Sequence, residues 1–239
     1  MDGDRTGGAA AGSPRVTYAA TLTRIVERAP DTLSFFFRLP TTRHLAFTPG
    51  QFISCLLPIE GQTMIRPYSL ASSPEESELE ICLNRVVGGP GSNYLFGLRV
   101  GATLRFTGPW GTFTLVRPPE AECVFIADGT GIAPIRPMLR RALASLHVHP
   151  LRLHHAAVDQ AHVIYAAEFE AATREHSNFT FEPLFGGSLA KYVERRYVTE
   201  DSDRRRHFYI CGVGELVPQL RDLLRRSGYG RRAVQYEKW

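Results

Sequence analysis

The spacing of apolar and polar residues divides the chain into two parts with different rhythms. Up to about Val116, short β-rich runs follow one another and are separated by Pro-Gly, Gly-Gly-Pro-Gly and Gly-Pro turns. This pattern predicts an antiparallel sheet or barrel with little helix. The expected strands cover residues 16–26, 32–39, 51–57, a stretch around 68–70, 79–86 and 103–107, with a short helical turn at 91–97.

After Pro118-Pro119, strand-like runs alternate with helical ones. The expected strands are 123–127, 151–157, 179–184, 207–211 and 233–236. Apolar residues with a 3.6-residue period predict helices that open near Ile135 and Leu216. Pro137 and Pro218 are expected in first turns, where a missing N–H costs nothing. The alternation predicts a parallel α/β sheet, so we expect a disordered tail (1–14), a β domain (15–117) and an α/β domain (118–239).

Composition and charge narrow the function classes. The 239 residues carry a net charge of +4, shared evenly between the two halves, and no basic block typical of a nucleic-acid-binding protein. No apolar run approaches the ~18 residues that a membrane span needs. The first residues lack the apolar core of a secretory signal. We therefore expect a cytoplasmic protein with no nucleic-acid partner and no membrane span.

The cysteines and histidines lack the spacing of metal ligands. Cys55, Cys82, Cys123 and Cys211 are scattered, without the short spacings of an iron–sulfur cluster or a zinc ribbon. The close histidine pairs have no accompanying carboxylate or thiol cluster, so solvated or core histidines are expected. We predict no metal site.

Two glycine-rich segments stand at the ends of predicted strands in the α/β part. Gly129 and Gly131 follow the strand 123–127 and open a helix, where free N–H groups favour an anion. Gly212 and Gly214 follow Cys211 at the end of another strand. Ligands of open α/β sheets bind at the carboxyl ends of strands, so the pair suggests one shared crevice. A plain tight turn before a helix, and a buried structural thiol at Cys211, remain the alternatives.

The β-rich part holds a second group of polar and aromatic residues. One extended run contains Arg66, Tyr68 and Ser69. These residues suit a flavin dinucleotide: the guanidinium can pair with the pyrophosphate, the aromatic ring can lie against the flavin ring, and the hydroxyl can hydrogen-bond a ring nitrogen. Gly91 and Ser92, in the segment 88–95, suit a backbone nest for its pyrophosphate.

Taken in order, the motifs resemble those of the ferredoxin–NADP reductase family from about residue 15 to the last residue. The set is Pro49-Gly50-Gln51-Phe52, Arg66-Pro67-Tyr68-Ser69, Gly91-Ser92-Asn93, Gly108-Pro109-Trp110-Gly111, Gly129-Thr130-Gly131-Ile132-Ala133-Pro134, Cys211-Gly212-Val213-Gly214 and Tyr236-Glu237-Lys238-Trp239. The resemblance implies an N-terminal six-stranded antiparallel β-barrel that binds FAD and a C-terminal domain with a five-stranded parallel sheet for NAD(P)H. The implied activity is that of an NAD(P)H-dependent flavoprotein reductase.

The resemblance also implies roles for individual residues. Arg66 would hold the FAD pyrophosphate, Tyr68 would lie against the isoalloxazine, and Ser69 would hydrogen-bond near flavin N5. Ser69, Cys211 and Glu237 are the implied catalytic residues, the last two beside the nicotinamide, and Trp239 would shield the flavin face. Further cofactor contacts are implied for Pro67, Cys82, Leu83, Asn84, Gly91, Ser92, Gly129, Thr130, Gly131, Gly212 and Gly214.

Three departures from the family pattern bear on the nucleotide. Asn84 stands where plant-type members have a lysine. Asp128 puts a carboxylate beside the expected phosphate-binding turn. Its charge weakens anion binding unless the side chain caps the helix or points away. The stretch 185–188 lacks the arginine of NADP-specific members, which favours NADH. Tyr192 remains available to stack on adenine, and nearby cations, Lys191, Arg195 and Arg196, leave NADPH open.

Since the chain has no cluster cysteines, its electrons are expected to pass to a separate ferredoxin, flavodoxin or oxygenase component. One alternative is a free-flavin or ferric-siderophore reductase, which needs no protein partner. Another, motivated by Asn84 and Asp128, is a non-catalytic FAD-binding electron-transfer or regulatory subunit.

Overall fold

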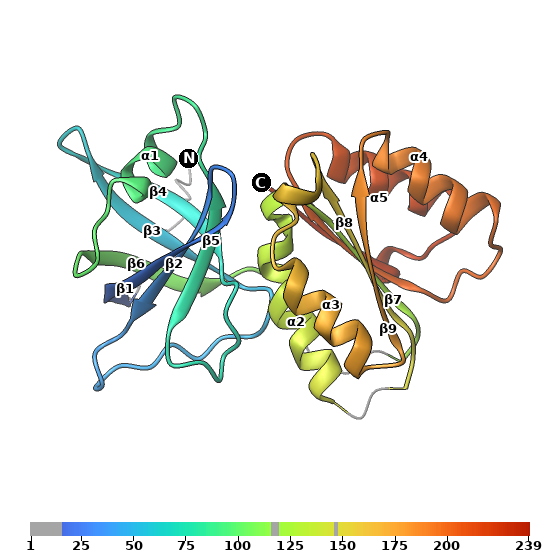
Figure 1. Ribbon diagram of the computed structural model, residues 1–239, viewed down its shortest axis with the longest axis horizontal. Coiled ribbons are helices and arrows are strands. Elements are labelled where there is room, and N and C mark those ends of the chain that lie inside the picture. Colours follow the sequence, from blue (N-terminus) through green and yellow to red (C-terminus); the bar gives the residue numbers. More distant parts are fainter. Residues whose placement is uncertain (1–15, 116–119, 146–147) are drawn as a thin grey trace, which may run out of the picture.

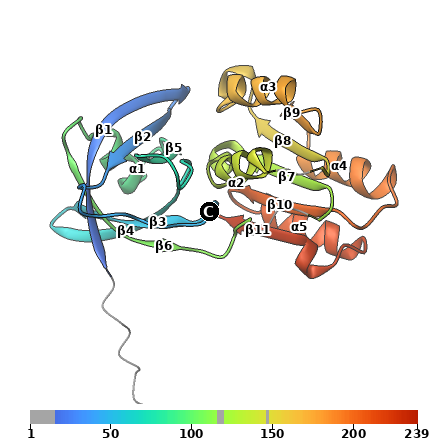
Figure 2. The ribbon, with the colours of Figure 1, turned by 90° about the horizontal axis from the view of Figure 1, so that it is seen from below.

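The computed structural model describes residues 16–115, 120–145 and 148–239 and places them in two domains. The expected tail at 1–14 and the expected boundary at Pro118-Pro119 lie outside these residues. Figures 1 and 2 show the β domain on one side and the α/β domain on the other, with the C-terminus between them in both views.

The first domain is a six-stranded antiparallel sheet in the order β4-β3-β6-β1-β2-β5. A bridge between Leu70 and Ile81 connects the end of β4 to β5 and closes the sheet into the predicted barrel. Its core contains Phe35, Phe37 and Phe106, all less than 2 % exposed. The elements are β1 (Thr17–Ala29), β2 (Thr32–Arg38), β3 (Phe52–Ile59), β4 (Gln62–Ser69), β5 (Leu79–Asn84), α1 (Pro90–Phe96) and β6 (Thr103–Trp110).

The second domain is a five-stranded parallel sheet in the order β11-β10-β7-β8-β9, as predicted. Its strands are β7 (Cys123–Asp128), β8 (Leu151–Ala157), β9 (Phe179–Phe185), β10 (His207–Gly212) and β11 (Val234–Lys238). Its helical segments are η1 (Gly129–Gly131), α2 (Ile132–Ala144), η2 (Gln160–His162), α3 (Ala166–Glu175), α4 (Leu189–Glu194), the π-helix η3 (Arg195–Thr199), α5 (Leu216–Arg226) and η4 (Arg231–Ala233).

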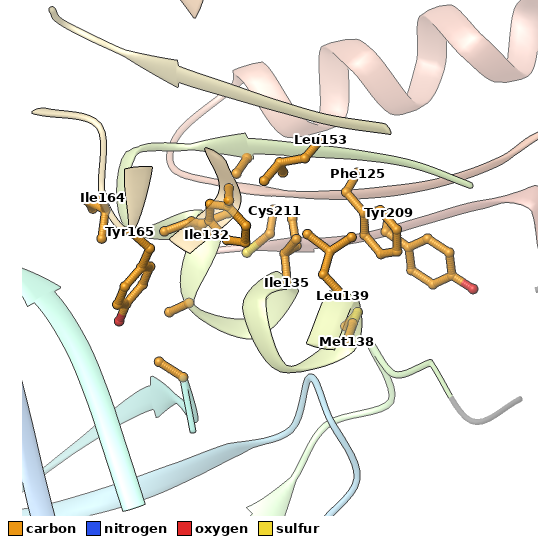
Figure 3. Close-up of a cluster of buried hydrophobic side chains, with 14 of the residues drawn as sticks. Phe125, Ile132, Ile135, Met138, Leu139, Leu153, Ile164, Tyr165, Tyr209 and Cys211 are labelled. Carbon is orange, nitrogen blue, oxygen red and sulfur yellow. The ribbon is translucent and has the colours of Figure 1, made fainter. Parts of the chain in front are cut away.

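Alternate residues of each central strand face opposite layers of helix. Phe125 of β7 belongs to a cluster that α2 and α3 cover on the side nearer the barrel, whereas Ile126 belongs to the cluster under α4 and α5. Figure 3 shows the first cluster, with Ile132, Ile135 and Leu139 of α2 packed onto the sheet. Because both faces of the sheet are buried there, β7 and most of β10 are continuous apolar runs.

The structure corrects two details of the sequence analysis. Pro137 lies inside α2 and not in its first turn, because the helix already begins at Ile132; Pro218 does fall in the first turn of α5. Strand β4 is longer than the stretch expected around 68–70, because most of its side chains are exposed on both faces and give no apolar alternation.

A buried ionic network joins the two domains. Arg136 of α2 donates to Glu80 of β5 at 2.6 Å and to the carbonyl of Ala71 at 2.9 Å, and its side chain is 7 % exposed. Glu80 also accepts from Tyr165, at 2.8 Å, and from Arg28 of β1, at 3.0 Å. Arg136 and these partners fix α2 against the barrel.

The second half of this network lies nearer the surface. Glu168 of α3 pairs with Arg136 at 2.8 Å and with Arg140 at 2.7 Å, and Arg140 reaches Glu76 of the barrel at 2.7 Å. Because α2 begins directly after the glycine-rich turn η1, the network also fixes the position of that turn relative to the barrel.

Candidate functional site

A cavity of about 440 Å³ lies where the barrel meets the carboxyl end of the parallel sheet. Most of the residues predicted to contact FAD line it, and both domains contribute. The lining residues are Arg66, Pro67, Tyr68, Ser69, Cys82, Leu83, Asn84, Val86, Gly89, Pro90, Gly91, Ser92, Thr130, Ala133, Val213 and Trp239.

The end of β4 forms the barrel wall of the cavity. Arg66 and Tyr68 lie two residues apart on this strand and therefore on the same face. The Arg66 guanidinium is exposed and donates to the carbonyl of Ile65. Burial raises the pKa of Tyr68 to about 12, so its hydroxyl is neutral and can donate a hydrogen bond.

Ser69 carries an orphaned hydroxyl in this wall. Its Oγ is buried and has no hydrogen-bond partner within the described part of the chain. An unpaired buried hydroxyl costs about 1–3 kcal/mol, and such a group on a cavity wall indicates a ligand that pairs with it. The position matches the predicted role of Ser69 beside the flavin ring.

The first turn of α1 approaches β4 closely. A Cβ at Gly91 would lie 2.9 Å from Arg66 Cγ and 3.2 Å from the Tyr68 hydroxyl, so a side chain there would displace the cavity wall. Ser92 is buried, and its hydroxyl accepts from the Val86 N–H at 3.0 Å. The Ser92 side chain therefore holds the loop 86–89 in place. The backbone of Ser92 is the part of this residue that suits a phosphate.

The α/β wall of the cavity lies at the point where the strand order reverses. Strands β7 and β10 are neighbours, and η1 and the 212–214 loop leave their carboxyl ends. A Cβ at Gly131 would lie 2.2 Å from the carbonyl oxygen of Cys211, so only glycine allows the two loops to touch. Ligands of open α/β sheets bind at such a reversal, as the two glycine-rich segments predicted.

Two contacts bring the domains together around the cavity. Thr130 Oγ1 lies 3.5 Å from Asn84 Oδ1 of β5. The Trp239 N–H donates to the Gly212 carbonyl at 3.1 Å, and its ring meets Phe52 of β3 edge-on at 5.4 Å. Trp239 therefore covers the cavity from the C-terminal strand and stays 37 % exposed.

Cys211 and Glu237 are neighbours in register on β10 and β11 but do not line the cavity. Cys211 is 1 % exposed and lies among apolar side chains facing α2, as Figure 3 shows. Burial, followed by the charge of Glu237, raises the pKa of this thiol. In the described residues Glu237 Oε2 has no hydrogen-bond partner, and burial raises the pKa of Glu237 to about 7.

Gly129, Gly131, Gly212 and Gly214 also lie outside the lining, where they shape the two loops. His155, buried on β8, lies 2.9 Å from the Gly129 carbonyl and supports the first loop. Burial lowers the pKa of His155 to about 4, so it is neutral. Asp128 does not cap η1 with its side chain, and burial raises its pKa.

Five lining residues were not among those predicted from the sequence. Four of them, Gly89, Pro90, Ala133 and Val213, lie within motifs identified in the sequence, so their neighbours were the available signal. Val86 had no such signal. In the arginine run 204–206, Arg206 is 8 % exposed and pairs with Glu122 at 2.6 Å, so this run is not simply a solvated loop.

The donor set fits a flavin dinucleotide. A guanidinium, a flat aromatic side chain and an unpaired hydroxyl follow one another along one strand, and Gly89 and Gly91 line the same cavity. In this order they match a pyrophosphate, a ring system and its polar edge. Among the described residues, no helix is both long and apolar enough to span a membrane.

The two domains match known families. Residues 19–115 match the oxidoreductase FAD-binding domain, and residues 125–222 match the oxidoreductase NAD-binding domain. Ferredoxin–NADP reductase B from Sorangium cellulosum is 32% identical over 93% of this chain and 97% of its own length. A ferredoxin–NAD(P)(+) reductase component of naphthalene 1,2-dioxygenase/salicylate 5-hydroxylase systems from Ralstonia is 29% identical, and the alignment spans 87% of this chain and 64% of that relative.

Solved structures share the two-domain arrangement. The cytochrome P450 reductase GcoB from Amycolatopsis superposes with a TM-score of 0.83 at 29% identity, over 94% of this chain and 70% of that chain. A ferredoxin NADP+ reductase from Neisseria gonorrhoeae, solved with bound FAD and NADP, has a TM-score of 0.82 at 20% identity, over 93% and 98% of the two chains. At this level of identity, the similarity to the Neisseria gonorrhoeae structure shows a shared fold.

Proposed function

Since the chain belongs to the ferredoxin–NADP reductase family, we propose that it moves electrons from NAD(P)H through FAD to a separate protein acceptor. One observation carries this function: a single cavity joins the flavin-type residues of the barrel to the glycine-rich strand ends of the parallel sheet. FAD, when bound there, supplies the hydride acceptor and the electron carrier. The protein supplies orientation and excludes water.

Within this proposal, β4 binds and orients the cofactor. Arg66 would neutralise the pyrophosphate, because its guanidinium is exposed and the methylene groups of its side chain lie beside Gly91, where the backbone approaches without a side chain. Tyr68 offers a ring and a neutral hydroxyl. Ser69 donates its otherwise unpaired hydroxyl proton to the polar edge of the flavin ring.

Trp239 covers the cavity and must move for a nicotinamide to stack in its place. Its ring meets Phe52 edge-on and its side chain hydrogen-bonds Cys211, so these contacts must break before the ring can move. Cys211 and Glu237 lie behind it, one strand spacing apart. We propose that they line the nicotinamide position once the Trp239 ring has moved, with Glu237 holding a proton near neutral pH.

The electrons must leave for another molecule. All four cysteines are free, buried thiols, and they lie on four different strands. Relatives named as electron transfer or reductase components of oxygenase systems support a ferredoxin, flavodoxin or oxygenase component as the acceptor. The buried free thiols also agree with a cytoplasmic location. We retain 15–117 and 118–239 as the proposed domain limits.

An anaerobic titration tests the function. FAD-loaded protein is titrated with NADH and, in parallel, with NADPH, and then mixed with oxidised ferredoxin, flavodoxin or free flavin. We expect bleaching of the flavin absorbance by at least one nucleotide and its return on adding a protein carrier. A yellow protein that neither nucleotide bleaches would contradict the proposal and favour a non-catalytic subunit. Rapid turnover with free flavin but not with any carrier would favour a flavin reductase.

A further inference from the structure

One tyrosine of the α/β domain reaches across to the barrel beside the cavity. Tyr165 is buried and lies directly before α3, and Figure 3 shows its ring projecting from the cluster toward the barrel strands. Its hydroxyl donates to Glu80 of β5 at 2.8 Å and lies 3.3 Å from the hydroxyl of Ser34 on β2. The Tyr165 side chain therefore spans the interface between the two domains.

The backbone holds Tyr165 in an unusual conformation. Its φ is +60°, in the left-handed region that bulky side chains rarely adopt. Such a conformation persists only where the surroundings fix the residue. The guanidinium carbons of Arg28 and Arg136 lie 4.9 Å and 4.2 Å from the centre of the ring, one from each domain, and attract it. The contacts with both domains therefore hold this ring in one place.

The Tyr165 hydroxyl also contacts the wall of the cavity. Cys82 lines the cavity, and its side chain hydrogen-bonds both Tyr165 and Ser34. These two hydroxyls donate their only protons to Glu80, at 2.8 Å and 2.6 Å. Burial raises the pKa of Cys82 to about 11, so the thiol keeps its proton and is the remaining donor. The thiol proton is therefore directed at the two hydroxyls and not at a ligand in the cavity.

One face of β5 connects this contact with the nucleotide side of the cavity. Glu80, Cys82 and Asn84 alternate with residues of the barrel core, so their side chains share the face that meets the α/β domain. Asn84 lies 3.5 Å from Thr130 of η1. Four residue steps of about 3.3 Å each separate Glu80 from Asn84, with Cys82 midway. Tyr165 therefore anchors one end of a strand face whose other end meets the glycine-rich turn.

Hydride transfer requires the reacting atoms to approach within about 3–3.5 Å, and a misplacement of about 1 Å slows such a step strongly. In the proposed function the barrel holds FAD and η1 faces the nucleotide, so the contact between the domains sets this approach. Resting on the proposed function, we propose that Tyr165 is a positioning residue for hydride transfer, because its hydroxyl holds the Cys82 wall of the cavity in place relative to η1.

The test uses Tyr165→Phe, which keeps the ring and removes the hydroxyl. Tyr229→Phe is the matched control, because Tyr229 is a buried tyrosine of the same domain whose hydroxyl donates to the carbonyls of Tyr197 and Asp203, under the helices of the other sheet face. Visible absorbance and circular dichroism of the bound, oxidised flavin report on the cavity without any nucleotide. Stopped-flow reduction over a range of nucleotide concentrations separates the limiting rate from the nucleotide Kd.

We expect Tyr165→Phe to retain FAD, to shift both spectra of the bound flavin, and to lower the limiting rate of flavin reduction at least fivefold. Its nucleotide Kd should stay within twofold of the wild type. Tyr229→Phe should lose stability in urea unfolding but keep the spectra, and its limiting rate should stay within twofold. Cys82→Ala should show the same two changes as Tyr165→Phe. Adding Tyr165→Phe to Cys82→Ala should change the rate by less than twofold, because the hydroxyl acts through the thiol.

A Tyr165→Phe protein with the spectra and rate of the wild type would overturn the inference. Equal changes in Tyr165→Phe and Tyr229→Phe, or full additivity of Tyr165→Phe with Cys82→Ala, would do the same. So would a Cys82→Ala protein that matches the wild type, whether or not Tyr165→Phe folds. Failure of the proposed function has a different signature: neither nucleotide bleaches the wild-type flavin, whereas the spectra of the bound flavin still report on Tyr165 and Cys82.

Discussion

We expect Arg136→Met to destabilise the protein by about 3 kcal/mol, because it removes a guanidinium that pairs with polar groups of both domains, among them the buried Glu80. The guanidinium donates to Glu80 at 2.6 Å, to Glu168 at 2.9 Å and to the carbonyl of Ala71 at 2.9 Å. Methionine fills a similar volume but donates nothing. The Glu80 side chain is 2 % exposed, so water does not replace the lost donor.

The size of this loss in the free energy of unfolding depends on the hydrogen bonds that Glu80 keeps in the variant. Removing one partner of a buried ion pair costs about 3–5 kcal/mol. Glu80 retains hydrogen bonds from Arg28, Ser34 and Tyr165, which places the expected loss at the lower end of this range. For a chain of this size, each kcal/mol corresponds to a change in Tm of about 2–4 °C. The expected fall in Tm is therefore about 6–12 °C.

Thermal and urea unfolding of Arg136→Met measure this loss, with Arg140→Met as the matched control. Arg140 lies one turn further along α2, but its side chain is 32 % exposed and its partners Glu76 and Glu168 are partly exposed. Such pairs contribute about 0–1 kcal/mol. The single variant Glu80→Gln and the double variant Arg136→Met/Glu80→Gln complete a double-mutant cycle. This cycle isolates the coupling free energy between Arg136 and Glu80.

The pH dependence gives an independent check. Burial opposes ionisation of Glu80, but Arg136, Ser34 and Arg28 together outweigh it and hold the pKa of Glu80 below its usual value. A lowered carboxyl pKa stabilises the fold above about pH 4.3 and loses this contribution as the pH falls through the folded value. The wild type and Arg136→Met should therefore converge in stability at acid pH. An effect under 1 kcal/mol at pH 7, or equal effects of the variants at 136 and 140, would refute the reasoning.

Three further predictions concern the cavity wall and the residues behind it. Ser69→Ala should slow reduction of bound flavin in stopped flow while FAD stays bound, and a wild-type rate would remove Ser69 from the reacting edge. Gly131→Ala should cost more than about 2 kcal/mol in urea unfolding, because its Cβ would meet the Cys211 carbonyl at 2.2 Å; Gly230→Ala, where a Cβ meets nothing, should be nearly neutral, and equal losses would contradict the steric argument. Glu237→Gln should stabilise the protein by roughly 1–3 kcal/mol at pH 8 and by little at pH 4. The raised pKa of Glu237, about 7, means that the folded wild type loses stability as the pH rises from about 4.3 to 7; parallel pH profiles of the two proteins would contradict this.

The domain classes and most strands could be predicted from the sequence, because their signals are local. A strand buried on both faces, such as β7, is a short apolar run, and glycine pairs mark its end. Strand β4 was largely missed, since most of its side chains from Gln62 to Tyr68 are exposed. Its pairing with β3 depends on a two-residue turn at Glu60 and Gly61, both with positive φ, and not on apolar alternation.

The polar networks could not be predicted in the same way. Arg28, Glu80, Arg136 and Glu168 are far apart in the chain, and arginine and glutamate in a sequence are usually exposed. Burial of the Arg136–Glu80 pair becomes visible only once the two domains are in contact. The same holds for His154, whose partner Glu182 reaches it through the pairing of β8 with β9.

The ionic network around α2 limits how freely the two halves of such a reductase can be exchanged. Arg136, Tyr165 and Glu168 come from one half, whereas Arg28 and Glu80 come from the other. A chimera that joins this barrel to the nucleotide domain of a relative would keep its charges balanced only if the donor presents the same set at the same places. Parent pairs for recombination should therefore be chosen by their match at these five positions ahead of their overall identity.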